Sequence, residues 1–110
     1  MTHKMRLDPA PFAATKKGLK RIEIRLNDEK RKVLKKDDTI EFENTETGEK
    51  LTVQVKAVRK YKSMSALMSS EEFSKTGGIY QDPGHWAKSI NSYYTKADQE
   101  KFGLLSIEIN

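Results

Sequence analysis

The sequence predicts an α+β fold, in which short helices pack around a small curved sheet or partly closed β-barrel. The main observation is that apolar and polar residues alternate, as they do in strands, in four segments: 20–26, 39–43, 51–60 and 104–109. Helix-start signals lie between these segments. The last alternating segment ends the chain, so it must join a sheet that earlier strands form. The 110 residues suit a single domain, which we expect over 1–110.

The first expected element is a short helix over about 9–17. Asp8-Pro9 offers an N-cap followed by proline at the first helical position, and Gly18 offers a stop. Phe12 is the expected inward anchor of this helix.

Two strand signals follow the helix. In 20–26 the apolar residues face the core, and Arg21, Glu23 and Arg25 share the opposite face. The segments 39–43 and 51–57 both alternate, with the turn signal Thr47-Gly48 between them. These two segments are expected to pair as antiparallel strands.

The second half is expected to be helical until its last few residues. Ser63 can cap a turn that carries Leu67, and Ser69 with Glu72 fits a capping box for a second turn with Phe73. Residues 76–78, Thr-Gly-Gly, form a flexible break.

A longer helix is expected to start at Asp82-Pro83. It places Trp86, Ile90 and Tyr93 on one stripe, which is more typical of core than of a binding surface. Tyr94, about 100° further around, is then the candidate exposed ring. A capping pattern, Thr95 with Asp98, starts another turn that Gly103 ends.

Composition excludes several classes of protein. With 35% hydrophobic and 34% charged residues, the chain is too apolar for a disordered tail and too charged for a membrane span. It has no cysteine and only two histidines, so we expect no disulfide, no cysteine nucleophile, no metal site and no cofactor. The first residues lack the apolar core of a signal peptide, which favours a cytoplasmic protein.

Positive charge is concentrated in the first half of the chain. Residues 1–62 carry 17 basic and 10 acidic side chains, whereas residues 63–110 carry 4 and 6. A basic segment attracts polyanions such as nucleic acid, but it is equally compatible with a solvated surface. Charge alone favours neither reading.

A motif in residues 18–25 favours the first reading. Gly-Leu-Lys-Arg-Ile-Glu-Ile-Arg resembles the G-x-K-x-x-E-x-R signature of ASCH domains, small PUA-like β-barrels with RNA-linked roles. A preceding helix with Pro11-Phe12, a strand after the acidic turn Asp37-Asp38, and a Tyr93-Tyr94 helix leading into the closing strand also fit that family. The usual Gly-Asp of the family is Asp37-Asp38 here. The resemblance implies a PUA-like fold and an RNA or nucleotide-like ligand.

The motif residues can act as a cluster or only as an ion-pair ladder. A carboxylate between guanidinium groups stays ionised and holds them in place. Lys20 formally points to the other face, and it joins Glu23 and Arg25 only if the chain after Gly18 twists or bulges. The expected ligand-binding residues are Gly18, Lys20, Arg21, Glu23, Arg25 and Tyr94. Phosphates would be steered by Lys30, Arg31, Lys32, Lys35 and Lys36.

Two other functions stay open. PUA-like deacetylases of N4-acetylcytidine carry Lys-x-x-Thr at the matching place, but Glu23 replaces that threonine here, and neither Glu71 nor Glu72 matches their downstream glutamate with certainty. Lys20 and Glu23 could still serve as acid and base on RNA or a modified nucleoside, as in ASCH relatives reported as ribonucleases. The other possibility is a protein-interaction module whose basic face meets an acidic partner.

Overall fold

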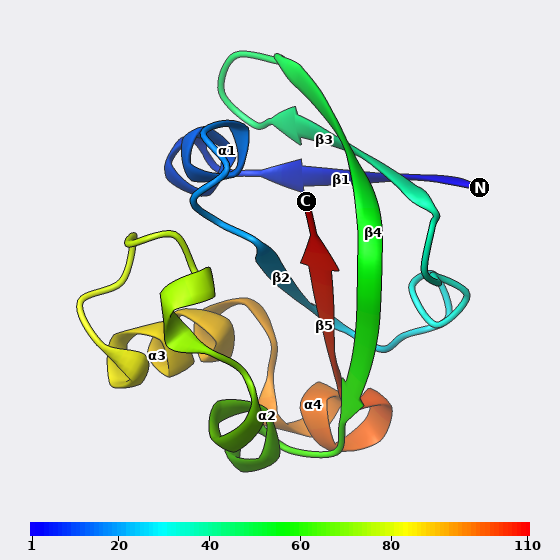
Figure 1. Ribbon diagram of the computed structural model, residues 1–110. Coiled ribbons are helices and arrows are strands. Elements are labelled where there is room, and N and C mark those ends of the chain that lie inside the picture. Colours follow the sequence, from blue (N-terminus) through cyan, green and yellow to red (C-terminus); the bar gives the residue numbers. More distant parts are fainter.

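The computed structural model describes residues 1–110, and its centre is a curved five-stranded sheet with the strand order β1-β3-β4-β5-β2 (Figure 1). The strands are β1 (Thr2–Leu7), β2 (Ile22–Leu26), β3 (Thr39–Asn44), β4 (Lys50–Tyr61) and β5 (Leu104–Ile109). β1 runs parallel to β3, and all other neighbours are antiparallel. This confirms the expected α+β fold and the hairpin of β3 with β4.

The long strand β4 gives the sheet its curvature. Its first half pairs with β3 and its second half with β5, and the register shifts between Val55 and Ala57. A bulge of this kind bends the strand and increases its twist. The sheet therefore folds into a half-barrel whose two edge strands are β1 and β2.

Two strand predictions were wrong in detail. The first expected strand began at residue 20, yet Thr2–Leu7 also forms a strand, β1, with Met5 and Leu7 buried between charged neighbours. In addition, β2 begins at Ile22, so Lys20 and Arg21 lie before the strand. Their backbones instead pair with residues outside β2.

Four α-helices and one 3₁₀ turn complete the fold. They are α1 (Pro9–Lys16), α2 (Met64–Ser70), the turn Phe73–Lys75, α3 (Pro83–Tyr93) and α4 (Lys96–Phe102). Three expected caps are confirmed: the side chains of Ser63, Asp82 and Thr95 each accept a backbone N–H at the start of their helix. None of these helices is long and apolar enough to cross a membrane.

Other helix-start signals were misread. Ser69 does not cap the Phe73 turn, because it lies inside α2 and donates to the carbonyl of Ser65, and Glu72 makes no side-chain cap bond. Asp8 precedes α1 as expected, but its carboxylate does not cap that helix. Asp37 adopts a left-handed φ of 74°, a conformation that non-glycine residues other than asparagine and aspartate rarely take.

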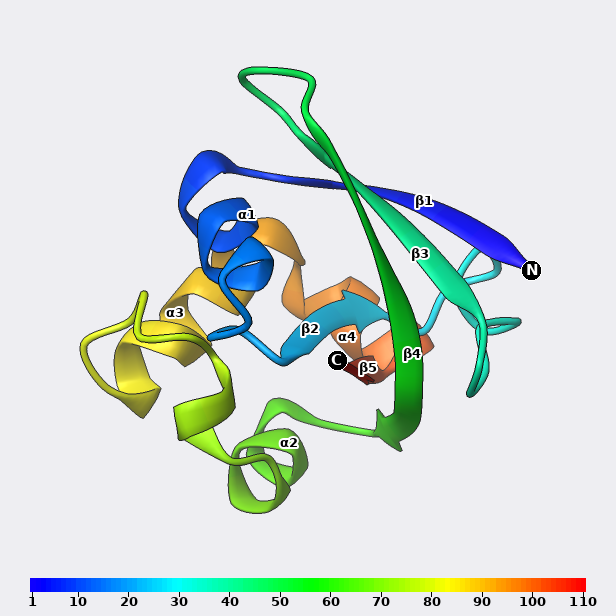
Figure 2. The same ribbon diagram turned by 45° about the horizontal axis from the view of Figure 1, so that its top comes forward.

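The core has two parts, which meet at β5. One part lies in the half-barrel around Ile40, Phe42 and Phe12, the confirmed anchor of α1. The other lies between β2 and the helices α2 to α4, around Ile22, Leu67 and Trp86. The turned view in Figure 2 shows α1 and α3 on the same side of β4, beside β2. The space between these two helices and β2 holds the candidate site.

Candidate functional site

The motif Lys20 is turned toward Glu23 by contacts that precede β2. Its backbone pairs with Thr76 as an isolated antiparallel bridge, and the next residue, Arg21, donates its N–H to the carbonyl of Lys75. Gly77 lies against Lys20 on the same side. Because the strand alternation does not extend back to Lys20, its side chain reaches the face of Glu23 and is 5% exposed.

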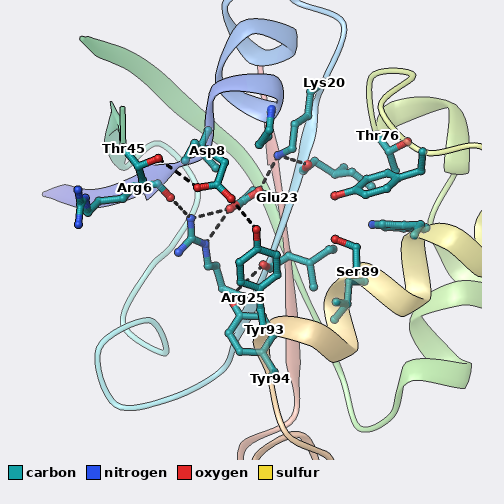
Figure 3. Close-up of a pocket in the computed structure, with 17 residues that line it drawn as sticks. Arg6, Asp8, Lys20, Glu23, Arg25, Thr45, Thr76, Ser89, Tyr93 and Tyr94 are labelled. Carbon is teal, nitrogen blue, oxygen red and sulfur yellow. Dashed lines mark hydrogen bonds and ion pairs between the residues drawn. The ribbon is translucent and has the colours of Figure 1, made fainter. Parts of the chain in front are cut away.

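Lys20, Glu23 and Arg25 form a buried ion triad. The Nζ of Lys20 lies 2.6 Å from Oε1 of Glu23 and 2.8 Å from the carbonyl of Ile22. Arg25 approaches the other carboxylate oxygen, with Nε at 2.8 Å and Nη2 at 2.7 Å from Oε2. Figure 3 shows the carboxylate of Glu23 between the two cations. Both oxygens of the carboxylate are thus occupied within the protein.

The charges in the triad stabilise one another. Burial alone would raise the pKa of Glu23, but the positive charges and hydrogen bonds of Lys20 and Arg25 outweigh this effect and hold it below the ordinary value. Burial would likewise lower the pKa of Arg25, and the Glu23 carboxylate raises it instead. Glu23 and Arg25 are therefore both charged at neutral pH.

Arg25 also connects the two edges of the half-barrel. Its Nη2 donates to the backbone carbonyl of Arg6 at 2.9 Å. Since Arg6 lies on β1 and Arg25 on β2, this guanidinium spans the seam where the barrel does not close. The site is thus located where two edge strands leave backbone groups without a neighbouring strand.

A cavity of about 230 Å³ lies over the triad. Its floor is Lys20, Glu23 and Arg25, and its far wall comes from α3 and the segment before it. The wall is largely aromatic and includes a buried tryptophan (Figure 3). The wall consists of Thr76, Tyr80, Trp86, Ser89, Ile90, Tyr93 and Tyr94.

Asp8 joins two elements at the rim of the cavity. Its carboxylate accepts hydrogen bonds from the hydroxyl of Tyr93 at 2.7 Å and from the hydroxyl of Thr45 at 3.1 Å. The bond to Asp8 raises the pKa of Tyr93 to about 12. The carboxylate that the sequence placed at a helix cap thus connects the end of α3 to the β3–β4 turn.

The expected site residues fall into two groups. Lys20, Glu23, Arg25 and Tyr94 all line the cavity, whereas Gly18 and Arg21 are exposed and do not. The five basic residues expected to steer phosphates lie in the loop between β2 and β3, on the other side of β4 from α3 (Figure 1), and none lines the cavity. Two of them make ion pairs, Arg31 with Asp28 and Lys32 with Glu29.

The assignment of the two tyrosines was wrong. Tyr93 is the exposed one at 66%, and Tyr94 is half-buried against the apolar cluster of β2 and α3. Tyr94 follows Ile90 by four residues, one full turn, so it shares the inner face more closely than Tyr93 does. The expectation that Trp86 belongs to the core is confirmed at 3% exposure, although one edge of the cavity is formed by the same residue.

Sequence reasoning missed several cavity residues that come from distant segments. Thr45 and Tyr80 are loop residues with no motif around them, and Thr76 belongs to the Thr-Gly-Gly segment that the sequence indicated as a flexible break. Ser89 had a usable signal, because it stands three residues after Trp86 on the face that also carries Tyr93. Glu71 lies elsewhere, where its carboxylate accepts hydrogen bonds from Arg59 and Tyr61.

The site holds no arrangement of metal ligands. The structure contains no group of three or more histidine, aspartate or glutamate side chains that could bind an ion together.

Comparisons with known proteins agree with the fold. The family model of the ASCH domain matches residues 5–110. Among solved structures, the hypothetical protein PH0355 is 32% identical, with a TM-score of 0.87 over 100% of this chain and 98% of that one. Protein PF0455 from Pyrococcus furiosus is 30% identical, with a TM-score of 0.77 over 100% and 96%. No curated protein matches. The chain belongs to the ASCH domain family.

Proposed function

We propose that this chain is an RNA- or nucleotide-binding domain, and that its ligand places one base in the cavity over Lys20, Glu23 and Arg25. The observation that carries this proposal is the combination of a buried polar floor with an aromatic wall in one cavity. Single-stranded nucleic acids are recognised in this way, by hydrogen bonds to base edges and stacking on aromatic rings. Membership in the ASCH family supports the same class of ligand.

The size of the cavity favours a single base. Pockets for drug-sized ligands are roughly 300–1,000 Å³, and this cavity is about 230 Å³. It therefore fits one ring system of a larger molecule better than a whole nucleotide chain. The remaining nucleotides would lie outside it.

The triad suits a neutral base better than a phosphate. Glu23 neutralises one of the two cations beside it, so the floor carries a net charge of only one. Lys20 has three N–H donors and uses two of them within the protein, so one donor remains. A base carbonyl or ring nitrogen would accept that bond.

An enzyme acting on RNA or a modified nucleoside is the second candidate, because Lys20 and Glu23 lie 2.6 Å apart beside the cavity. The hydroxyls of Thr76 and Ser89 also line this space, yet neither is hydrogen-bonded to Lys20 or Glu23, and that of Thr76 donates to the carbonyl of Phe73. A nucleophile paired with its base, the usual sign of covalent catalysis, is not assembled. Binding is thus the better-supported function.

The experiment is an amide chemical-shift titration with the four common nucleosides, modified nucleosides and short single-stranded RNAs. Ser89→Phe places a large ring in the cavity and leaves the residues of the triad unchanged. Ser92→Phe, at an exposed position on the same helix, is its control. We expect shifts at residues 20–25 and in α3, and at least a tenfold loss of affinity in Ser89→Phe only.

Other outcomes would assign other functions. A product found in the samples after incubation, and lost in Lys20→Ala, would favour the enzyme. No shift with any nucleoside or RNA would contradict the proposal and leave the interaction module, with an acidic protein as partner.

A further inference from the structure

A second hollow of about 560 Å³ adjoins the cavity at Tyr94. It is bounded by residues 62–65, which connect β4 to α2 and begin that helix, by the end of α3, and by α4. Tyr94 lines both the cavity and this hollow, so the two spaces meet at this residue. We refer to the hollow as the lysine groove, after Lys62 and Lys96.

The charged side chains of the lysine groove are two lysines and one glutamate. Lys62 follows β4 and Lys96 begins α4, both are exposed, and neither makes an ion pair in the structure. Glu100 is the single acidic residue of the lining. Two unpaired ammonium groups on one groove attract an anion, and lysine binds phosphate as a compact point charge with no fixed bidentate geometry.

The floor of the lysine groove is fixed by a buried amide. Gln99 is 7% exposed, and its side-chain nitrogen donates to the side chain of Asn91 at 2.8 Å and to the backbone carbonyl of Tyr94 at 3.0 Å. This side chain ties α4 to the end of α3. The position of Tyr94, where the two spaces meet, is therefore fixed by the packing of α4 against the end of α3.

Two neighbouring tyrosine rings lie near the place where the two spaces meet. The rings of Tyr93 and Tyr94 lie 6.4 Å apart at 49°, and Tyr93 is 66% exposed at the cavity rim. Exposed rings beside cationic grooves provide stacking surfaces for successive bases of a single strand. The two rings thus adjoin the cavity, and Tyr94 also lines the groove.

We propose that the lysine groove holds the phosphodiester backbone next to the base in the cavity, so that the ligand is a single-stranded oligonucleotide of at least two nucleotides. This inference rests on the proposed function, because it needs a base in the cavity. It adds a second site and excludes a free nucleoside as the complete ligand.

The test compares two double variants of equal charge. Lys62→Gln with Lys96→Gln removes both ammonium groups of the groove. Lys4→Gln with Lys56→Gln removes two exposed, unpaired lysines of β1 and β4 that line neither space. Each protein is titrated with the four nucleosides and with the matching single-stranded RNA homotetramers.

Log affinity falls against log salt, and the loss of two phosphate contacts makes this slope shallower by about 1.4. At 0.1 M salt this change corresponds to about 25-fold weaker binding of the tetramers. We expect this loss in the groove variant alone, with nucleoside affinity unchanged. Equal losses in both double variants, or no loss in either, would contradict the role of the lysine groove. Nucleoside binding in the same experiment would still support the cavity as the site of the base.

Two further results would also overturn the inference. If the wild-type protein bound the tetramers no more tightly than the nucleosides, the groove would not hold the backbone. If hexaglutamate competed as well as the tetramers, the groove would be a site for acidic protein segments. Absence of binding by nucleosides and tetramers alike would instead remove the proposed function itself.

Discussion

Gly77 lies so close to Lys20 that a Cβ at position 77 would come within 2.8 Å of the Lys20 Cβ and 2.9 Å of its Cα. Position 77 also has a φ of +89°, which residues with a side chain rarely adopt. This contact presses the Thr76–Gly78 segment onto the first charged residue of the motif. It explains how a loop residue far along the chain helps to direct Lys20 toward Glu23.

Gly77→Ala is expected to destabilise the protein more than Gly78→Ala does. At Gly78 the φ is +76° but a Cβ would meet no atom within 4 Å, so only backbone strain of about 1–2 kcal/mol is expected. At Gly77 overpacking adds about 1–3 kcal/mol. Urea denaturation of the two variants measures the difference. Equal stabilities would show that the close approach to Lys20 is not required.

The position of Lys20 could not have been derived from the sequence around it. Strand alternation correctly placed Glu23 and Arg25 together, because both lie within β2. It failed at Lys20 because the bridge to Thr76 and the contact with Gly77 involve residues more than fifty positions away. Periodicity describes a strand, and it does not reveal where a distant loop stops that strand from extending.

β1 and Asp8 were missed for a related reason. In β1 the buried Met5 and Leu7 alternate with Lys4 and Arg6, and this short pattern pairs with β3, which lies more than thirty residues later. Asp8 carries a strong local signal for a helix cap, but two hydroxyls from other elements compete for its carboxylate. In both cases the structure depends on partners that are distant in the sequence.

Acid is expected to weaken the protein in part through Glu23. The pKa of Glu23 is lowered in the folded state, so the unfolded chain takes up the proton first. The stability from this group is fully present above its ordinary pKa of 4.5, and it is lost as pH falls through the lower folded value. The free energy of unfolding should therefore decrease as the pH is lowered from 6 to 2.

Glu23→Gln separates this contribution from those of other carboxylates with lowered pKa values, such as Glu71 and Asp38. The substitution leaves Lys20 and Arg25 buried side by side, at an expected cost of about 3–5 kcal/mol at neutral pH. Below pH 4.5 the variant should lose less stability than the wild type. Glu72→Gln, at an exposed position, should behave like the wild type. Parallel curves for Glu23→Gln and the wild type would contradict the argument.

Tyr93 is expected to ionise near pH 12 because its hydroxyl donates to Asp8. Asp8→Asn removes the negative charge beside this hydroxyl, so the pKa of Tyr93 should fall toward 10.0. The ring-carbon NMR signals of labelled tyrosine, followed against pH, report each residue separately, and Tyr93→Phe identifies the signal. An unchanged pKa in Asp8→Asn would show that the rim contact is absent in solution.

Arg25→Lys is expected to open the seam between β1 and β2. A lysine ammonium can still pair with Glu23, but it lacks the planar fork that lets Arg25 also reach the carbonyl of Arg6. Loss of a hydrogen bond with a charged donor costs about 1.5–3 kcal/mol, and β1 is held by β3 on one side only. Amide hydrogen exchange should accelerate in β1 and stay slow in β4 and β5. Arg21→Lys, at an exposed motif position, is the matched control. Wild-type protection of β1 in Arg25→Lys would mean that this guanidinium does not hold the half-barrel together.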